Sequence, residues 1–302
     1  MRCPEFSRRG LLTGALGVSA TYLCAGPFRV LGPEKALPII QDSLVAMGTR
    51  VSFLVRHPEP RFARSVITQA MAKVMNVHAT MTLHDESPLT HLNRRASTQA
   101  VWVPDSLLDV LLAGVDVHRE SGGVFDPSLH SAQGGMQDIE IDAEQRTVRF
   151  HHADVSVDLN GIAKGYAVDV ASDHLRSAGI EHFIVNAGGD LYASGHSSEA
   201  RSGWSIHLES NEDIRWQLSD RAVATSGNVH QQKDTSGRPI PHLIDPRSGA
   251  PIDQYQSSTI IAERVMLADA WSTALFVGER SSMTERIERD PRMRAHSVPR
   301  KT

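Results

Sequence analysis

The chain has 302 residues, of which 40% are hydrophobic and 22% are charged, and its formal net charge is −4. This composition is that of an ordinary globular protein, and it excludes a wholly disordered or collagen-like chain. With 31 basic and 35 acidic residues, the totals show no nucleic-acid footprint. The two cysteines, Cys3 and Cys24, both lie near the N-terminus, so neither a disulfide framework nor a thiolate zinc site is expected in the body of the protein.

The N-terminal segment has the pattern of an export signal. The paired arginines Arg8-Arg9 precede an uncharged stretch rich in small residues. A basic region followed by a short apolar region is typical of a signal peptide, and the twin arginine indicates the Tat route. The stretch lacks the ~20 strongly apolar positions that a membrane anchor needs. We therefore predict a Tat signal peptide over residues 1–30, a leader over 31–44 and a periplasmic location, with lipidation of Cys24 as a minor alternative.

After this segment, helical and strand patterns follow one another without a strict strand–helix–strand rhythm. The clearest helix is 105–120, which Pro104 opens and Gly122-Gly123 closes. Other helices are expected over 64–77, 165–178 and 267–277. Strands are expected over 45–55, interrupted by Met47-Gly48-Thr49, and over 155–159, 183–185, 204–208 and 257–262. These elements predict an α+β fold, a mixed β-sheet system flanked by helices, as a single compact unit over residues 45–280. Residues 281–302 are expected to form a basic C-terminal tail.

The segment 157–169, VDLNGIAKGYAVD, joins a predicted strand end to a helix start. Free backbone N–H groups at a helix start attract anions, and Lys164 adds a full positive charge there. Gly161 and Gly165 allow a ligand or another backbone to approach closely. A phosphate or pyrophosphate is the natural partner of such a turn. The motif matches neither a Walker A loop nor GxGxxG, so the spacing alone favours a plain strand-to-helix connection with a surface lysine.

Two further segments combine glycine turns with polar residues. The run NAGGD, residues 186–190, places two glycines at a strand end, which suits a ligand-binding turn and a purely structural turn alike. After Thr225-Ser226-Gly227 comes HLIDPRSG, residues 242–249, with a strong turn signature over DPRSG. His242 precedes this turn and is a candidate general base. The alternative is a histidine packed at a strand end.

The segment ADAWSTAL, residues 268–275, places Asp269 and Thr273 four residues apart, hence on one helix face. A carboxylate and a hydroxyl side by side are hard oxygen ligands, which suit Mg²⁺ or Ca²⁺ rather than zinc. The alternative is structural: Thr273 hydrogen-bonded within its helix, and Asp269 placed favourably near the helix N-terminus. If the carboxylate is a metal ligand, Asp269→Ala is expected to abolish metal-dependent turnover with little change in melting temperature.

In their order along the chain, these segments resemble the ApbE family, the FAD:protein FMN transferases. The matching stretches are Met47-Gly48-Thr49, SPLTHLN (87–93), GVFDP (123–127), VDLNGIAKGYAVD, NAGGD, TSG, HLIDPRSGAP and ADAWSTALFVG. They run from about residue 45 to residue 278, nearly all of the chain after the signal. The resemblance implies an ApbE-like catalytic unit.

The same resemblance implies binding of FAD and Mg²⁺ and transfer of FMN to a Thr or Ser of an exported or membrane acceptor protein, with release of AMP. It assigns Asp269, Thr273 and the carbonyl of Gly161 as metal ligands, and His242 as the base that activates the acceptor hydroxyl. The residues that it places around the flavin nucleotide are Met47, Val124, Phe125, Asp126, Asp158, Lys164, His242, Leu243, Ile244 and Asp245. Peripheral association with a membrane stays open.

Two other functions are compatible with the sequence: a non-catalytic FAD-binding carrier or maturation protein, and an FAD pyrophosphatase. At the position where the family often places an aromatic residue that stacks on the flavin, this chain has Leu83. The region 127–157 is also shorter than the family pattern. Both features favour the carrier.

Overall fold

The computed structural model describes residues 37–128, 131, 133–208, 211–227 and 255–299, which belong to one compact unit that begins at Leu37. The predicted signal peptide and the first part of the leader, residues 31–36, lie outside the described residues. In chain order the elements are β1 (Ile39–Ala46), β2 (Thr49–Arg56), α1 (Pro60–Met81), α2 (Pro88–Arg95), β3 (Val101–Trp102), α3 (Asp105–Ser121), the 3-10 turn η1 (Met136–Asp138), β4 (Ile139–Asp142), β5 (Thr147–Phe150), α4 (Ala163–Ser177), β6 (His182–Ala187), β7 (Asp190–Ser194), β8 (Trp204–Leu208), β9 (Asn211–Leu218), β10 (Arg221–Gly227), β11 (Tyr255–Ala262), α5 (Val265–Val277), α6 (Arg280–Ile287) and β12 (Arg294–Pro299).

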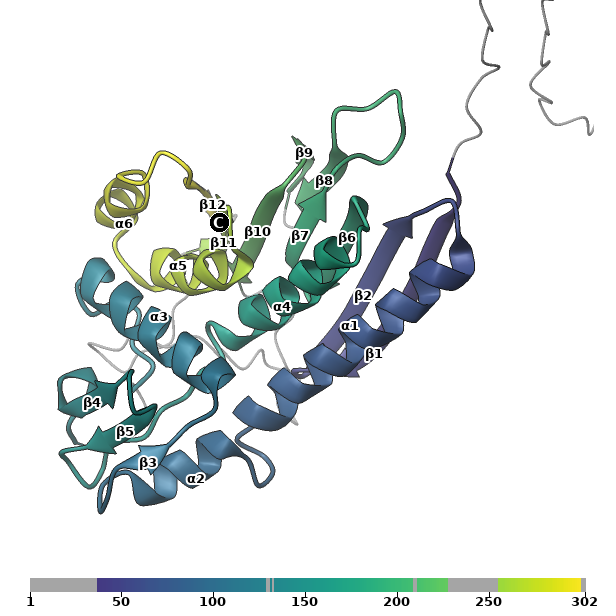
Figure 1. The fold of residues 1–302 in the computed structure, drawn as a ribbon. Coiled ribbons are helices and arrows are strands. Elements are labelled where there is room, and N and C mark those ends of the chain that lie inside the picture. The colour runs from purple at the N-terminus through teal and green to yellow at the C-terminus, as the bar shows by residue number, and fades with distance from the viewer. Residues whose placement is uncertain (1–36, 129–130, 132, 209–210, 228–254, 300–302) are drawn as a thin grey trace, which may run out of the picture. The chain divides into compact units, whose positions relative to one another are not determined.

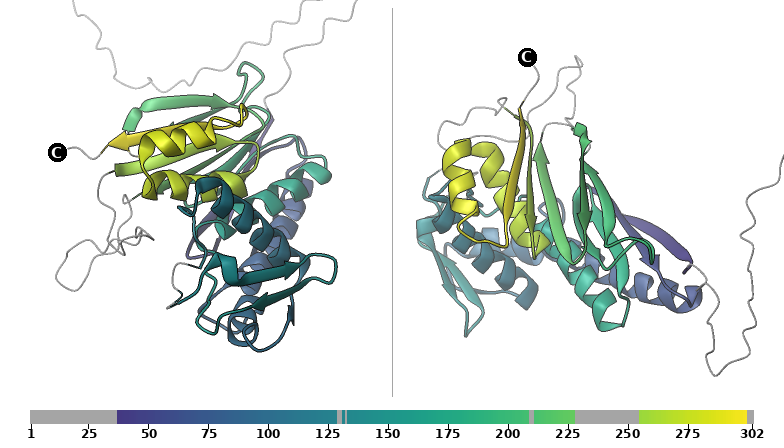
Figure 2. Two further views of the ribbon diagram at one scale, coloured as in Figure 1. Left: turned by 90° about the vertical axis from the view of Figure 1, so that its left-hand side faces the viewer. Right: turned by 90° about the horizontal axis from the view of Figure 1, so that it is seen from above.

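The main sheet has seven strands in the order β1-β2-β6-β7-β10-β11-β12, and each neighbouring pair is antiparallel. Helices α1, α4 and α5 pack on one face of this sheet, and the hairpin β8–β9 lies over the other (Figures 1 and 2). The larger hydrophobic core lies between the sheet and the helices, and a smaller one lies under the hairpin. The predicted α+β class, with sheets flanked by helices, is confirmed.

Both ends of the predicted domain differ from expectation. The interruption expected at Met47-Gly48-Thr49 is the turn of a hairpin, with Met47 and Gly48 both at positive φ (53° and 70°), and the first strand of this hairpin begins before residue 45. Strand β1 therefore takes in the last part of the expected leader, residues 39–44. The basic tail expected over 281–302 is wrong, because α6 and β12 extend the fold and β12 pairs with β11. Met283, Ile287 and Met293 are buried, so apolar residues among the basic ones anchor this segment.

The segment 155–159, expected to be a strand, is not assigned as one, and it is in no ladder with the strands of the described residues. The side chain of Asn93 in α2 takes the place of a strand partner, because its amide donates to the carbonyl of Val157 (2.9 Å) and its oxygen accepts from the Val157 N–H (2.9 Å). The N–H of Asp158 donates to the carbonyl of Pro127 (2.8 Å). A side-chain amide with one donor and one acceptor can satisfy a buried peptide in this way. Asn93 thus fixes the segment that leads to Gly161.

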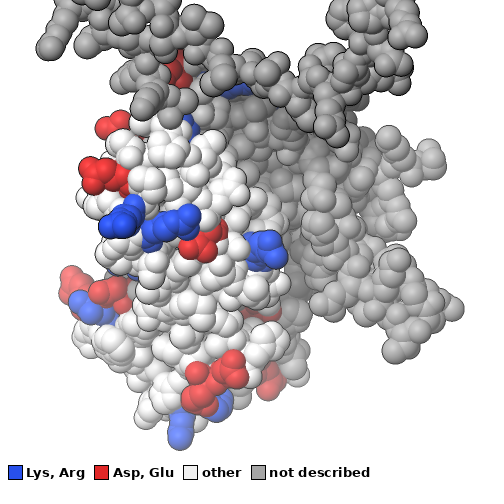
Figure 3. All heavy atoms as spheres, turned by 90° about the vertical axis from the view of Figure 1, so that its right-hand side faces the viewer, with Lys and Arg blue, Asp and Glu red and all other residues white. Residues whose placement is uncertain are grey.

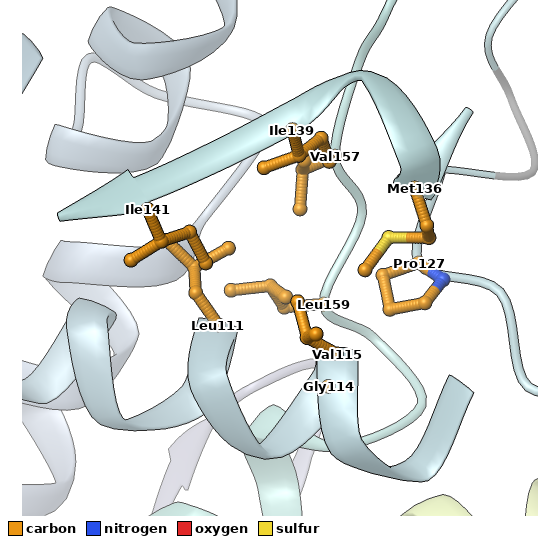
Figure 4. Close-up of a pocket in the computed structure, with 9 residues that line it drawn as sticks. All are labelled: Leu111, Gly114, Val115, Pro127, Met136, Ile139, Ile141, Val157 and Leu159. Carbon is orange, nitrogen blue, oxygen red and sulfur yellow. The ribbon is translucent and has the colours of Figure 1, made fainter. Parts of the chain in front are cut away.

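The small antiparallel sheet β3-β5-β4 is attached to α3 by apolar packing (Figure 4). The side chains that meet there come from α3, from η1 and β4, and from the segment 155–159. They are Leu111, Val115, Met136, Ile139, Ile141, Val157 and Leu159, beside Gly114 and Pro127. The space between them has no room for a water molecule. This contact is therefore packing and not a ligand cavity.

On the face that Figure 3 shows, basic and acidic side chains of the described residues are interspersed on a largely uncharged surface. That part of the surface therefore has no large field of a single sign. Among the described residues, no helix has both the length and the apolar character needed to cross a bilayer.

Candidate active site

The centre of the candidate site is a lysine held between two buried carboxylates. Lys164 lies in the first turn of α4, and its Nζ is 2.5 Å from Oδ2 of Asp190 and 3.2 Å from both carboxylate oxygens of Asp269. Asp190 opens β7 directly after the glycine turn, and Asp269 lies on α5. Both aspartates are 2% exposed, whereas the lysine side chain is 29% exposed. Three segments that are far apart in the sequence therefore meet at one charged cluster.

The net charge of this cluster depends on the protonation of Asp190. Burial, followed by repulsion from Asp269, raises the pKa of Asp190 to about 7 despite the attraction of Lys164. Burial disfavours the charged lysine, but attraction to Asp190 and Asp269 outweighs it and raises the pKa of Lys164 above its ordinary value. The lysine is therefore charged at neutral pH and neutralises one carboxylate only. When both carboxylates are ionised, a surplus negative charge remains that a further cation can neutralise.

Hydroxyl groups lie beside the charged cluster. Oγ1 of Thr273, one helical turn after Asp269, shares a hydrogen bond of 3.2 Å with Oγ of Ser226 in β10. A Cβ on Gly161 would lie 3.4 Å from this Thr273 hydroxyl and 3.1 Å from the ring of Phe125. The structure therefore brings the loop that carries Gly161 against the hydroxyl of Thr273. The expected alternative, in which Thr273 bonds only within its own helix, does not describe this arrangement.

The donor chemistry of these residues fits a hard divalent cation. Asp269 offers a carboxylate, Thr273 a hydroxyl and Gly161 a main-chain carbonyl, and all are oxygen donors of the kind that Mg²⁺ takes. Within the part of the chain that the structure describes, no group of three or more His, Cys, Asp or Glu could hold a metal. A single carboxylate with neutral oxygens therefore suits a cation whose remaining ligands come from substrate phosphates and water.

The turn of the hairpin β1–β2 adjoins the glycine turn before Asp190. A Cβ on Gly188, which has a φ of 63°, would lie 2.6 Å from Oγ1 of Thr49. Glycine at this position therefore permits the close contact of the two turns. Met47, half-buried in the hairpin turn, is placed at the same end of the sheet as Asp190.

Four residues expected around the flavin nucleotide lie in two adjoining segments. Val124 and Phe125 are buried, at 8% and 4% exposure, and belong to the main core. The carboxylate of Asp126 accepts from the N–H and the hydroxyl of Ser128 (2.8 and 2.6 Å), while that of Asp158 accepts from the N–H of Asn160 (2.8 Å). These carboxylates thus order their own turns, and their contact with a flavin stays a prediction. His242, Leu243, Ile244 and Asp245 lie outside the described residues.

Two residues of the candidate site, Asp190 and Ser226, were missed by the sequence analysis. Asp190 was present in the NAGGD run, but only its glycines were considered, although an acid directly after a double-glycine turn was an available signal. Its carboxylate also accepts from the N–H of Thr225 (3.3 Å), which links the turn to the TSG segment. Ser226, in that segment, shares hydrogen bonds with Ser272 (2.7 Å) and Thr273. The structure thus joins motifs that the sequence shows separately.

The model of the ApbE family matches residues 47–296, and the chain belongs to the ApbE family. A protein of Rhodobacter capsulatus named FAD:protein FMN transferase is 27% identical over 308 residues; the match covers 89% of this chain and 57% of that protein. One of the same name from Vibrio cholerae is 27% identical over 287 residues, which cover 83% of this chain and 85% of that protein. The chain thus spans little more than half the length of the first relative.

Solved structures agree with the fold. The ApbE protein of Thermotoga maritima superimposes with a TM-score of 0.75 at 24% identity, covering 87% of this chain and 94% of that one. The apo form of the Pseudomonas stutzeri flavinyl transferase ApbE gives a TM-score of 0.74 at 22% identity, covering 87% of this chain and 95% of that one. These likenesses establish the predicted ApbE-like fold.

Proposed function

We propose that the protein transfers FMN from FAD to a Thr or Ser hydroxyl of an acceptor protein, in a Mg²⁺-dependent reaction that releases AMP. Family membership and the name shared by the relatives support flavin transfer. The single observation that supports the metal is that two buried carboxylates share one lysine beside further oxygen donors. A site of this kind favours a divalent cation that also binds phosphate oxygens.

Each group in the site has a defined task in this proposal. Mg²⁺ held by Asp269, Thr273 and the Gly161 carbonyl would neutralise charge on the pyrophosphate of FAD. Lys164 holds the Asp269 carboxylate in place and is itself fixed by Asp190. His242 is the proposed base that accepts the proton of the acceptor hydroxyl. The hydroxyl oxygen bonds to the phosphorus of the FMN half, the phosphoanhydride bond breaks, and AMP leaves.

Incubation of the protein with FAD, Mg²⁺ and an outward-facing acceptor protein from the same cell should give a covalently flavinylated acceptor. In-gel fluorescence and intact-mass spectrometry of the acceptor measure the product, and chromatography measures AMP. Omission of Mg²⁺, or its removal with a chelator, should abolish both signals. AMP release without an acceptor, at the full rate, would identify an FAD pyrophosphatase instead.

A second candidate function is an FAD carrier that does not transfer FMN. It is favoured by Leu83, which is 37% exposed just after α1 and offers no ring for stacking on a flavin. Purification with stoichiometric FAD that is not consumed when Mg²⁺ and acceptor are added would select the carrier. Transfer in the preceding assay would exclude it.

We further propose export by the Tat route to the periplasm, supported by Arg8-Arg9 and the apolar stretch that follows. Replacement of both arginines by lysine should keep the protein in the cytoplasm, because the Tat machinery recognises the arginine pair. Cell fractionation with antibody detection measures the distribution. A double variant exported as efficiently as the wild type would contradict this route.

A further inference from the structure

Helices α4 and α5 both begin without a cap of their own. The residues at the N-cap positions are Ile162 and Arg264, and neither side chain accepts a hydrogen bond from its own helix. The first turn of a helix leaves backbone N–H groups without an intrahelical partner, and buried ones must be satisfied elsewhere. The two helices therefore need acceptors from outside themselves.

Each helix receives its acceptor from the other. The carboxylate of Asp169, on α4, accepts from the N–H groups of Val265 (2.9 Å) and Met266 (3.0 Å) in the first turn of α5. The carboxylate of Asp269, on α5, accepts from the N–H of Gly165 (3.0 Å) in the first turn of α4. In both helices, the aspartate lies four residues after a residue whose N–H the other helix caps. This exchange, which we term the reciprocal cap, locks the two helix starts together.

The absence of a side chain at Gly165 makes the exchange possible. A Cβ there would lie 2.4 Å from the carbonyl oxygen of Val265 and 2.7 Å from Cα of Met266. The first turns of α4 and α5 are therefore in direct backbone contact. Each aspartate, one turn further along its own helix, is close enough to accept from the first turn of the other helix. Gly165 was read from the sequence as a place for a ligand or another backbone to approach, and the structure places the backbone of α5 there.

The two aspartates of the reciprocal cap have different surroundings. Asp269 also contacts Lys164 and belongs to the candidate site, whereas Asp169 contacts the first turn of α5 and Nε of Arg264 (3.2 Å). Asp169 is 2% exposed. Because it holds the first residues of α5, it determines where that helix starts, and Asp269 follows one turn later. The position of the Asp269 carboxylate beside Lys164 thus depends on a contact made outside the site.

We propose that Asp169 is a positioning residue for cation binding: through the N–H groups of α5 it places Asp269 and Thr273 against the loop of Gly161. The inference rests on the proposed function, because it assumes that Asp269 and Thr273 bind the cation. Removal of residues that orient metal ligands typically weakens metal affinity by about 10–100-fold. Asp169 itself touches neither the cation nor the substrate in this proposal.

Asp169→Asn tests the proposal. The amide keeps one oxygen acceptor but loses the other, so one of the two N–H groups of α5 is left unpaired and the start of the helix shifts. Binding of Mn²⁺ alone to the full chain, measured by electron paramagnetic resonance of the free ion, should weaken at least about tenfold.

The matched control is Asp173→Asn. Asp173 lies on the next turn of α4 and also contacts Arg264 (3.1 Å), so this variant removes the same charge near the same arginine. The N–H groups at the start of α5 donate to Asp169 and not to Asp173. The Mn²⁺ affinity of Asp173→Asn should equal that of the wild type.

A second variant, Val265→Pro, tests the proposal even if Asp169→Asn does not fold. Val265→Pro keeps the charge of Asp169 but deletes one of the two N–H donors, and its ring displaces the carboxylate oxygen that accepted from it. Proline is well tolerated at the first position of a helix. The Mn²⁺ affinity of Val265→Pro should fall between those of the wild type and Asp169→Asn. If Asp169→Asn does not fold, this variant alone decides, and wild-type affinity for it overturns the proposal.

The remaining outcomes are equally decisive. Wild-type Mn²⁺ affinity in folded Asp169→Asn overturns the positioning role. Equal weakening of Mn²⁺ binding in Asp169→Asn and Asp173→Asn also overturns it, because this result means a charge effect. A wild-type chain that binds no Mn²⁺ overturns it as well. A wild-type chain that binds Mn²⁺ but transfers no FMN contradicts the proposed function alone.

Discussion

Asp269→Ala should lower the rate of Mg²⁺-dependent FMN transfer by about 1,000-fold, because loss of the one carboxylate ligand removes several kcal/mol of transition-state charge stabilisation. The rate of acceptor flavinylation at saturating FAD measures this effect. The matched control is Asp173→Ala, which removes a half-exposed carboxylate from α4 and should leave the rate unchanged. Transfer by Asp269→Ala at the wild-type rate would contradict the role of this residue in the proposed reaction.

The structure changes the expectation for the stability of the same variant. From the sequence, Asp269→Ala was expected to leave the melting temperature nearly unchanged. The carboxylate is buried and accepts from the N–H of Gly165, so its removal leaves a buried donor unpaired, at a cost of about 1–3 kcal/mol. Asp269→Asn retains an oxygen acceptor and should cost less. Urea unfolding of the metal-free proteins measures the difference.

Lys164→Met should lower the free energy of unfolding of the metal-free protein by about 3 kcal/mol, the lower end of the range for removing one partner of a buried ion pair. The methionine fills the same space but leaves the carboxylates of Asp190 and Asp269 facing each other without a cation. The lower end applies because the lysine is 29% exposed. Chemical unfolding in the presence of a chelator measures the loss.

Mg²⁺ should restore part of this stability, because a cation held by Asp269, Thr273 and the Gly161 carbonyl offsets part of the negative charge that the lysine no longer neutralises. At 100 times its Kd, a ligand that binds only the native state adds about 2.7 kcal/mol. The control is Lys73→Met on the exposed side of α1, which should change stability by no more than about 0.5 kcal/mol and show no added response to Mg²⁺. If Lys164→Met is as stable as the wild type without metal, the cluster is not held together by charge.

The features that the sequence predicted correctly are those whose physical cause is local. Helix α3 was expected over 105–120 and runs from Asp105 to Ser121, because Pro104 precedes it and Gly122 ends it in the left-handed conformation at a φ of 70°. Helix α5 was expected over 267–277 and begins two residues earlier. The adjacency of Asp269 and Thr273 also followed from the sequence, since residues four apart share a helix face.

The features that the sequence did not reveal depend on contacts between distant segments. Strand β12 forms because β11 offers an edge to a segment that reads as a basic tail. Residues 155–159 have the composition of a strand, but a side-chain amide from α2 bonds the backbone of Val157, and none of the described strands pairs with the segment.

The sequence alone determined the family motifs, the α+β class and the oxygen-donor pair on α5. Only the tertiary structure decided that Asp190 shares Lys164 with Asp269, and that Asp169 caps the helix that carries Asp269. Hydrogen-bond partners and charge balance depend on which residues lie close together in space. Local periodicity and capping patterns in one sequence do not indicate which distant residues will meet.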